Sequence, residues 1–138
     1  MRGERRQLKN MQGNSCILDA NAVLRFLLRD NEEQFQQIKT IIRGKNCYVT
    51  LEVLAEVCYV LGGVYQVTRE DIAYNFRKLM NDMIILNVDI LLRGLEIFDK
   101  SPKLDFVDCL LYGYKWEKGI DIVTFDKKLQ RRLGEVFL

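Results

Sequence analysis

The sequence contains no histidine. Histidine is the side chain that most often acts as a general acid or base near neutral pH, and RNA cleavage without a metal usually depends on it. Its absence also excludes hydrolases built on a Ser-His-Asp or a Cys-His arrangement. If this chain hydrolyses a substrate, a water activated by a metal ion is therefore the leading mechanism.

Long hydrophobic runs and secretion features are also missing. No stretch approaches the roughly 18 uninterrupted apolar residues of a membrane-spanning helix, so we expect no transmembrane segment. The N-terminus is basic but lacks the apolar segment of a signal peptide. Both observations favour a cytoplasmic protein.

Cysteine is sparse, and its spacing does not indicate a metal site. The four cysteines, Cys16, Cys47, Cys58 and Cys109, form no C-x-x-C pair, and each lies in an apolar segment. Free buried thiols are therefore the simplest interpretation. A zinc site is the weaker alternative, because no histidine is available to complete it.

The length and charge of the chain indicate one folded domain preceded by a basic tail. A chain of 138 residues with 49% hydrophobic content is large enough for one domain with a buried core. Residues 1–10 carry a balance of +3, which leaves −1 of the net charge of +2 for the rest, so affinity for nucleic acid in general should be modest. We interpret residues 1–13 as a disordered tail and 14–138 as the domain; Met11 is an equally good start.

Strand-like and helix-like runs alternate along the chain. Apolar runs typical of buried strands occur at Ser15–Leu18, Cys47–Val49, Met83–Leu86 and Ile120–Thr124. Helical patterns occupy Asn21–Arg29, Asn31–Arg43 with Gly44 as its C-cap, Leu51–Leu61, Thr68–Asn81, Ile90–Phe98, Leu104–Lys118 and Lys127–Leu133. This order predicts an α/β fold: a three-layer α/β/α domain with a central, mostly parallel sheet of four to five strands.

Four acidic residues stand at the end of an apolar run or inside one: Asp19, Glu56, Asp108 and Asp126. An unpaired buried carboxylate costs several kcal/mol, so residues of this kind need compensation. Ligands of parallel α/β sheets bind beyond the carboxyl ends of the strands, which gives all four acids one expected location. Clustered carboxylates without matching bases suggest a hard divalent cation, Mg²⁺ or Mn²⁺.

Each acid also has a simpler explanation. Asp19 and Asp126 each precede a predicted helix, where an N-capping aspartate is common. Glu56 lies in the middle of a largely apolar helix, where the alternatives to a functional site are an exposed edge or a hidden salt bridge. Asp105 shares a helix face with Asp108 and either caps or begins that helix.

Other side chains near the acids are candidates for supporting roles. Thr124 can hydrogen-bond a ligand carboxylate or a metal-bound water. Asn21 can hold a water or orient Asp19, or it is simply a turn residue. We expect Asp105 either to support the ligands or to have a structural role. The basic residues that flank the acids can hold a phosphate backbone, although each group alone is more often a solvated face: Arg25, Arg29, Lys127 and Lys128, followed by Arg131 and Arg132. We interpret the aromatic residues Tyr112, Tyr114 and Trp116 as core or dimer contacts.

Four stretches in a fixed order resemble a known family. They are Leu18–Leu27, Val49–Leu61 around Glu56, Leu104–Leu110 and Ile122–Asp126. Together they resemble the PIN-domain ribonucleases, and most closely the VapC-type toxins of toxin–antitoxin pairs. In that resemblance the acidic quartet of the family falls on Asp19, Glu56, Asp108 and Asp126, and its polar positions fall on Asn21 and Thr124. Asp105 lies outside the quartet.

The resemblance implies an endoribonuclease that depends on Mg²⁺ or Mn²⁺, acts as a homodimer and is blocked by a small antitoxin protein. RNA as the substrate rests mainly on this resemblance. A non-catalytic RNA- or protein-binding scaffold with the same fold is the first alternative. A phosphotransfer protein with Asp19 as nucleophile is a second, disfavoured because Asp19-Ala20-Asn21 lacks an adjacent second acid.

Overall fold

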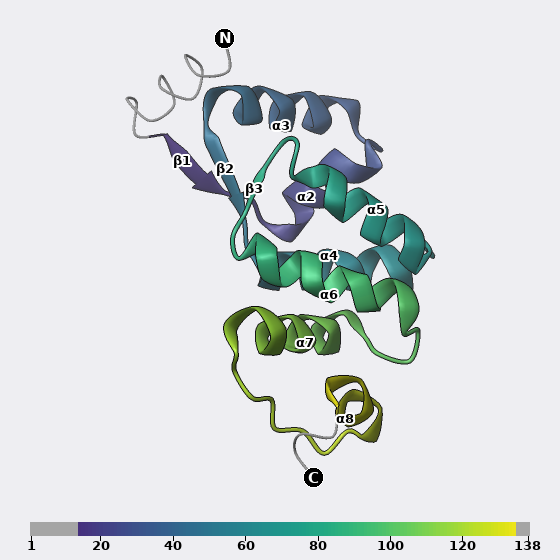
Figure 1. Cartoon of the computed structure of the whole chain (residues 1–138). Helices are drawn as coiled ribbons and strands as arrows, with labels where there is room; N and C mark the ends of the chain where they lie inside the picture. Colours follow the sequence, from purple (N-terminus) through teal and green to yellow (C-terminus); the bar gives the residue numbers. More distant parts are fainter. Residues whose placement is uncertain (1–13, 135–138) are drawn as a thin grey trace.

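A computed structural model describes residues 14–134 and shows an α/β fold with a parallel sheet (Figure 1). In chain order its elements are β1 (Ser15–Ile17), α2 (Ala20–Leu28), α3 (Glu32–Gly44), β2 (Asn46–Val49), α4 (Leu51–Gly63), α5 (Arg69–Leu79), β3 (Ile84–Ile85), α6 (Val88–Lys100), α7 (Phe106–Lys118) and α8 (Lys127–Leu133). The predicted helices and the first three predicted strands are formed, but the prediction that the first strand is buried was wrong, because β1 is an edge strand and its Ile17 is 63% exposed. The predicted tail, residues 1–13, lies outside the described residues.

The sheet is parallel and has the order β1-β2-β3. Cys16 of β1 lies opposite Cys47 of β2, and Val49 of β2 lies opposite Ile85 of β3. Cys47 and Val49 are buried, whereas β1 forms one edge of the sheet. Because all three strands run in one direction, residues that follow their carboxyl ends emerge at the same edge of the sheet.

The fourth predicted strand is not formed, so the described residues contain three strands rather than four to five. Residues 119–126 have no regular structure, and Figure 1 shows this connection at the far end of the molecule from β1. Ile122 is buried, but Val123 and Phe125 are 89% and 94% exposed. The prediction failed because a high strand propensity expresses packing against neighbouring strands, and no strand lies beside this segment.

The helix starts follow from local capping chemistry. The side chains of Asp19, Asn31, Thr50, Thr68, Asp105 and Asp126 each accept a hydrogen bond from a backbone N–H of the helix that follows. Gly119 ends α7 in the left-handed conformation, with φ of 64°, as its position predicts. The prediction for Gly44 was wrong: it is the last residue of α3, and Lys45 is the C-cap.

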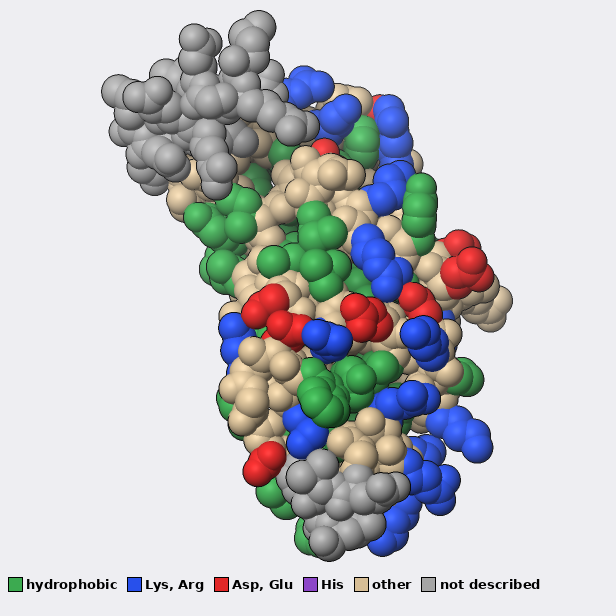
Figure 2. All heavy atoms as spheres, in the orientation of Figure 1, with side chains coloured by type: hydrophobic (Ala, Val, Ile, Leu, Met, Phe, Trp, Pro, Cys, Tyr) green, Lys and Arg blue, Asp and Glu red, His purple; other side chains and the backbone are tan. Residues whose placement is uncertain are grey.

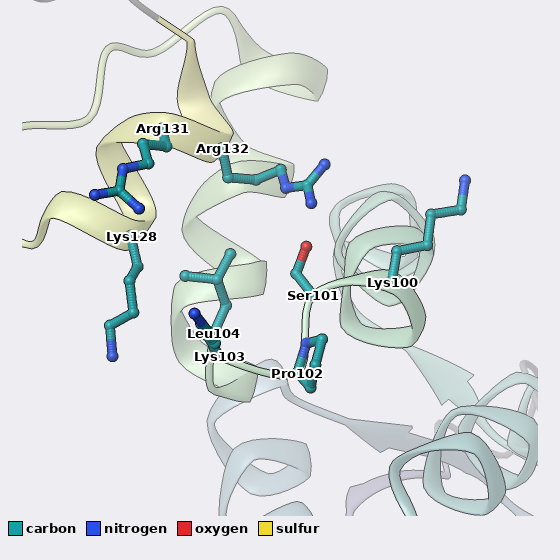
Figure 3. Close-up of a pocket in the computed structure, with 8 residues that line it drawn as sticks. All are labelled: Lys100, Ser101, Pro102, Lys103, Leu104, Lys128, Arg131 and Arg132. Carbon is teal, nitrogen blue, oxygen red and sulfur yellow. The ribbon is translucent and has the colours of Figure 1, made fainter.

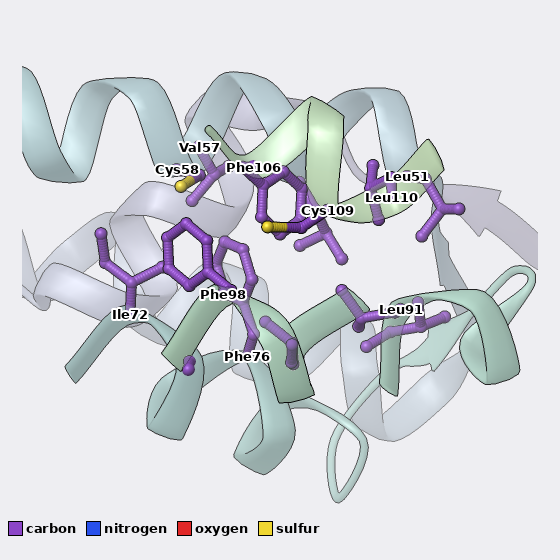
Figure 4. Packing of buried hydrophobic residues seen from close by; sticks show 14 of the residues in the cluster. Leu51, Val57, Cys58, Ile72, Phe76, Leu91, Phe98, Phe106, Cys109 and Leu110 are labelled. Carbon is purple, nitrogen blue, oxygen red and sulfur yellow. The ribbon is translucent and has the colours of Figure 1, made fainter. Parts of the chain in front are cut away.

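The core lies mainly between the helices, and α6 and α7 approach most closely. A Cβ atom at Gly113 would lie 2.5 Å from the carbonyl oxygen of Ile90, so glycine is required for this approach. Beside it, the ring of Phe106 packs edge-on against Phe76 and Phe98, at centroid distances of 5.6 and 5.7 Å (Figure 4). These contacts hold the start of α7, which carries Asp108, in a fixed position.

The cysteines and helices agree with two further expectations from the sequence. All four cysteines are free, and three are buried while Cys16 is half-buried. The Sγ atoms of Cys16 and Cys47 lie 3.4 Å apart across the two strands. Between residues 14 and 134, no helix is long and apolar enough to cross a membrane.

Candidate functional site

Asp19 joins the first strand to the first described helix and caps that helix. Its backbone is extended, and its Oδ1 accepts a hydrogen bond of 2.8 Å from the N–H of Ala22. The capping role that the sequence offered for Asp19 is therefore confirmed. The carboxylate remains exposed, as does Asn21 in the first turn of α2. Its second oxygen has no hydrogen bond within the described residues.

Glu56 lies in the middle of α4, on the face that turns away from the core. Its neighbours Val57 and Cys58 are buried, but Glu56 itself is exposed. Within residues 14–134 it has no ion pair, so the hidden salt bridge offered by the sequence is absent and the exposed edge is confirmed. An unpaired carboxylate on a mostly apolar helix is open to any ligand that approaches this face.

Asp108 is the least solvated of the four acids. It lies in the first turn of α7, is partly buried, and donates its backbone N–H to Oδ1 of Asp105 at 2.8 Å. Burial raises the pKa of the Asp108 carboxyl, and the negative charges of Asp105 and then Asp126 raise it further. Three carboxylates from two parts of the chain therefore interact at this point.

Asp126 is held in place by its own turn and by the helix that it caps. Its Oδ1 accepts hydrogen bonds from the N–H groups of Lys128, at 2.8 Å, and Leu129, at 3.3 Å. The hydroxyl of Thr124 accepts from the N–H of Asp126 at 3.0 Å. Thr124 thus orients the backbone of Asp126, while the predicted location of Asp126 at the end of a strand was wrong because that strand is not formed.

Of the four predicted acids, Asp108 and Asp126 interact in the structure. Helix α2 contacts α4, α4 contacts α7, and α7 contacts α8, so the elements that carry the four acids form a continuous series. The carboxyls of Asp108 and Asp126 interact, with Asp105 beside them. Among residues 14–134, however, no three acidic, cysteine or histidine side chains lie close enough together to hold a metal ion.

The basic residues predicted to bind RNA fall into two groups. Arg25 donates to Asp30 at 2.6 Å, and Arg29 forms two hydrogen bonds with Glu32 while its guanidinium covers the Phe35 ring at 4.2 Å. These two arginines already have partners. Lys127 and Lys128 are exposed at the start of α8, and neither has an ion pair in the described part of the chain.

Residues on the turn between α6 and α7 were missed by the sequence analysis. Lys100, Ser101 and Lys103 line a hollow together with residues of α8. The sequence does show two lysines and a serine around Pro102, the only proline of the chain, but we interpreted this stretch only as a loop and not as a binding surface. Its importance depends on which helix packs against the turn, and sequence spacing does not reveal that.

Comparison with known families identifies the family of the chain. A PIN domain family model matches residues 16–135. The chain belongs to the PIN domain family. PIN domains are generally metal-dependent nucleases, so the chain has a nuclease-like fold. Comparisons with curated proteins and with solved structures gave no match.

Proposed function

We propose that this PIN domain is an endoribonuclease that hydrolyses RNA phosphodiester bonds with the help of Mg²⁺ or Mn²⁺. The observation that carries the proposal is the interaction of Asp108 in α7 with Asp126, the cap of α8. Burial raises the pKa of the Asp108 carboxyl most, the charge of Asp105 raises it further, and the charge of Asp126 adds a smaller increase. A protein keeps such mutually repelling carboxylates most readily where a cation binds between them. The family of the chain supports the same chemistry.

The donor chemistry fits a hard divalent cation. Mg²⁺ and Mn²⁺ prefer carboxylate oxygens, and Asp19, Glu56, Asp108 and Asp126 supply only such groups. Repulsion among carboxylates opposes their approach when no cation is present. The proposal therefore requires Asp19 and Glu56 to come closer to Asp108 when the ion binds, because no group of three ligands exists among residues 14–134.

Under this proposal, the residues of the site bind the metal, orient the acids or hold the RNA backbone. The four acids hold the cation, which supplies an activated water and stabilises charge on the phosphate. Thr124 orients Asp126 by accepting from its N–H, and Asp105 fixes the start of α7 by accepting from the N–H of Asp108. The proposal gives Asn21, which is exposed beside Asp19, the task of orienting that carboxylate when the ion binds. Lys127 and Lys128, which follow Asp126, hold the RNA backbone by charge.

RNA cleavage with and without metal tests the proposal. Purified wild-type protein should cleave single-stranded RNA in millimolar Mg²⁺ or Mn²⁺ and lose that activity in EDTA. Asp19→Asn should abolish cleavage while keeping the helix cap, because asparagine caps helices as well as aspartate does. Asp82→Asn, an exposed carboxylate in a turn, is the matched control and should cleave like wild type. Cleavage that persists in EDTA, or in Asp19→Asn, would refute the mechanism.

We further propose that the chain is a VapC-type toxin that acts in the cytoplasm as a homodimer and is neutralised by a small antitoxin protein. This proposal rests on the order of the four matched stretches in the sequence. Sedimentation of the purified chain tests the dimer. Growth arrest on expression, absent in Asp19→Asn, tests the toxin, and a monomer without effect on growth would contradict both.

A non-catalytic scaffold is the second candidate. It is favoured by one observation: the four acids do not form a three-ligand group in the part of the chain that the structure describes. A scaffold binds RNA or protein without needing such a group. Wild-type protein that binds RNA but leaves it intact in both metals would support the scaffold over the nuclease.

A further inference from the structure

A basic hollow separates the turn between α6 and α7 from helix α8 (Figure 3). Its volume is about 370 Å³. The cations that line it are Lys100 and Lys103 on the turn and Lys128, Arg131 and Arg132 on α8, and no acidic side chain lines it. Figure 2 shows lysine and arginine side chains gathered at the lower right, over the region where Figure 1 shows α8 and the end of α6.

No acidic side chain among residues 14–134 neutralises the positive charge of the hollow by an ion pair. None of its five cations has an ion pair within residues 14–134. Three described acids close to these cations in sequence are engaged elsewhere. Asp99 pairs with Arg77 at 3.1 Å, Asp105 caps α7, and Asp126 caps α8. Several like charges around one concave surface repel one another unless an anion joins them.

Helix dipoles explain only part of this cluster. Lys100, Arg131 and Arg132 lie in the last turns of their helices, where a cation is favourable. Lys128 lies in the first turn of α8, where the helix dipole disfavours a positive charge. Lys103 lies outside any helix. The helix dipole therefore does not account for Lys103 and Lys128.

Ser101 provides a second, independent observation. Its side chain is buried, with 8% exposed, and its hydroxyl has no hydrogen-bond partner within the described residues. In Figure 3 this hydroxyl points to the side on which the guanidinium of Arg132 lies. Buried hydroxyls in native proteins nearly always have a partner, which for Ser101 a bound water or a ligand group would supply.

The turn that carries Ser101 is fixed from behind. The guanidinium of Arg69 donates to the carbonyl oxygens of Phe98, Ser101 and Leu104, at distances down to 2.6 Å. These carbonyls at the end of α6 would otherwise repel an anion. Arg69 neutralises them and leaves the opposite side of the turn, with Ser101 and Lys103, to face a negative ligand.

We infer that the basic hollow binds a backbone phosphate of the RNA, an inference that rests on the proposed function. An arginine guanidinium can donate two parallel hydrogen bonds to the oxygens of one phosphate, and lysine adds positive charge. The Ser101 hydroxyl would donate a further hydrogen bond to the phosphate. Two residues of the hollow are near the acids in sequence: Leu104 directly precedes Asp105, the cap of α7, and Lys128 lies two residues after Asp126, the cap of α8. RNA anchored in the hollow would therefore pass the starts of α7 and α8, where Asp108 and Asp126 lie.

RNA binding in EDTA tests this inference without cleavage. Fluorescence anisotropy with a labelled single-stranded RNA compares wild type with Lys128→Gln/Arg131→Gln. The matched control is Arg43→Gln/Lys45→Gln, which removes two exposed charges at the end of α3. The hollow variant should bind about tenfold more weakly, with a slope of log affinity against log salt about 1.4 smaller in magnitude. Equal losses in both double variants would overturn the inference.

Ser101→Ala separates ligand binding from folding. The variant should unfold at the same temperature as wild type or higher, because it removes a buried hydroxyl without a partner. Its affinity for RNA should fall. Unchanged RNA affinity would overturn the role of Ser101.

Inorganic phosphate distinguishes the two sources of the ligand group. Millimolar phosphate should compete only weakly with the labelled RNA, because a single phosphate lacks the neighbouring contacts of a chain. Phosphate that displaces RNA fully at low concentration would assign the hollow to a small free anion and overturn the RNA site. Wild-type protein that binds RNA through the hollow but does not cleave it would refute the proposed function alone.

Discussion

Asp108 and Asp126 lie close enough for their charges to interact, although Asp108 lies in α7 and Asp126 caps α8. After burial and the charge of Asp105, the charge of Asp126 contributes to the raised pKa of the Asp108 carboxyl. Carboxylates that repel one another destabilise the fold unless a cation binds. Under the proposed function, repulsion between Asp108 and Asp126 lowers the stability of the protein when no cation is bound.

Asp108→Asn tests this repulsion. The raised pKa means that the folded protein keeps the Asp108 proton at pH values where the unfolded chain has lost it. The contribution of Asp108 to the free energy of unfolding should therefore fall as the pH rises above the ordinary value of 3.8. Asp108→Asn should remove this fall, and without metal it should unfold at the same or a higher denaturant concentration than wild type near neutral pH.

The same variant should lose RNA cleavage completely. Urea unfolding at one pH below 3.8 and one near neutrality gives the stability result. Asp82→Asn serves again as the control and should follow wild type at both pH values. An Asp108→Asn protein that is clearly less stable than wild type near neutral pH would show that the ionised carboxylate stabilises the fold, contrary to the account.

Arg69→Met should destabilise the protein strongly. Arg69 donates to three carbonyl oxygens and stacks on the Phe98 ring at 3.7 Å, and the methionine side chain replaces only its aliphatic part. We expect a loss of about 2–4 kcal/mol, because carbonyls of the turn are left without donors. Arg77→Met breaks only an exposed pair with Asp99 and should cost about 0–1 kcal/mol. Chemical denaturation measures both, and equal costs would contradict the role of Arg69.

Gly113→Ala should loosen the packing of α6 on α7. The added Cβ atom meets the Ile90 carbonyl oxygen at 2.5 Å, so the helices must separate, at a cost of about 1–3 kcal/mol. Gly44→Ala adds the same methyl group where nothing lies within 4 Å and should leave stability unchanged or slightly raise it. Thermal unfolding of the two variants gives the comparison, and a neutral Gly113→Ala would mean that the helices lie farther apart than described.

Two buried thiols should make the protein sensitive to alkali. Burial raises the pKa of Cys58 to about 11 and that of Cys109 to about 12 from an ordinary value of 9.0. The unfolded chain releases these protons first, so the free energy of unfolding should fall as the pH rises above 9.0. Alkylation at pH 9.0 followed by mass spectrometry should label both residues slowly in the native protein and rapidly in urea. Equal rates would contradict their burial.

Helix boundaries were predictable because their causes are local. Asp19 and Asp126 cap helices with N–H groups two or three residues away, so the sequence contains both partners. The strand at Ile120–Thr124 was not predictable in the same way. Its residues favour a strand, but a strand needs a neighbour, and the neighbour is decided by how α7 and α8 pack.

The candidate site was predictable in composition but not in full geometry. The sequence singled out Asp108 and Asp126, and the fold brings them together. It also predicted that Asp19 and Glu56 join them, which stays a prediction. The basic hollow was missed because Ser101 and Arg132 come from separate elements, and only tertiary packing places them at one surface.

Thermal unfolding with increasing Mn²⁺ tests the central claim most directly. A cation that binds only the native state should raise the free energy of unfolding of wild type, by about 2.7 kcal/mol at a hundred times its Kd. Asp19→Asn should lose most of this increase, and Asp82→Asn should keep it. No stabilisation of wild type by millimolar Mn²⁺ or Mg²⁺, or equal stabilisation of wild type and Asp19→Asn, would contradict a divalent-cation site built on these acids.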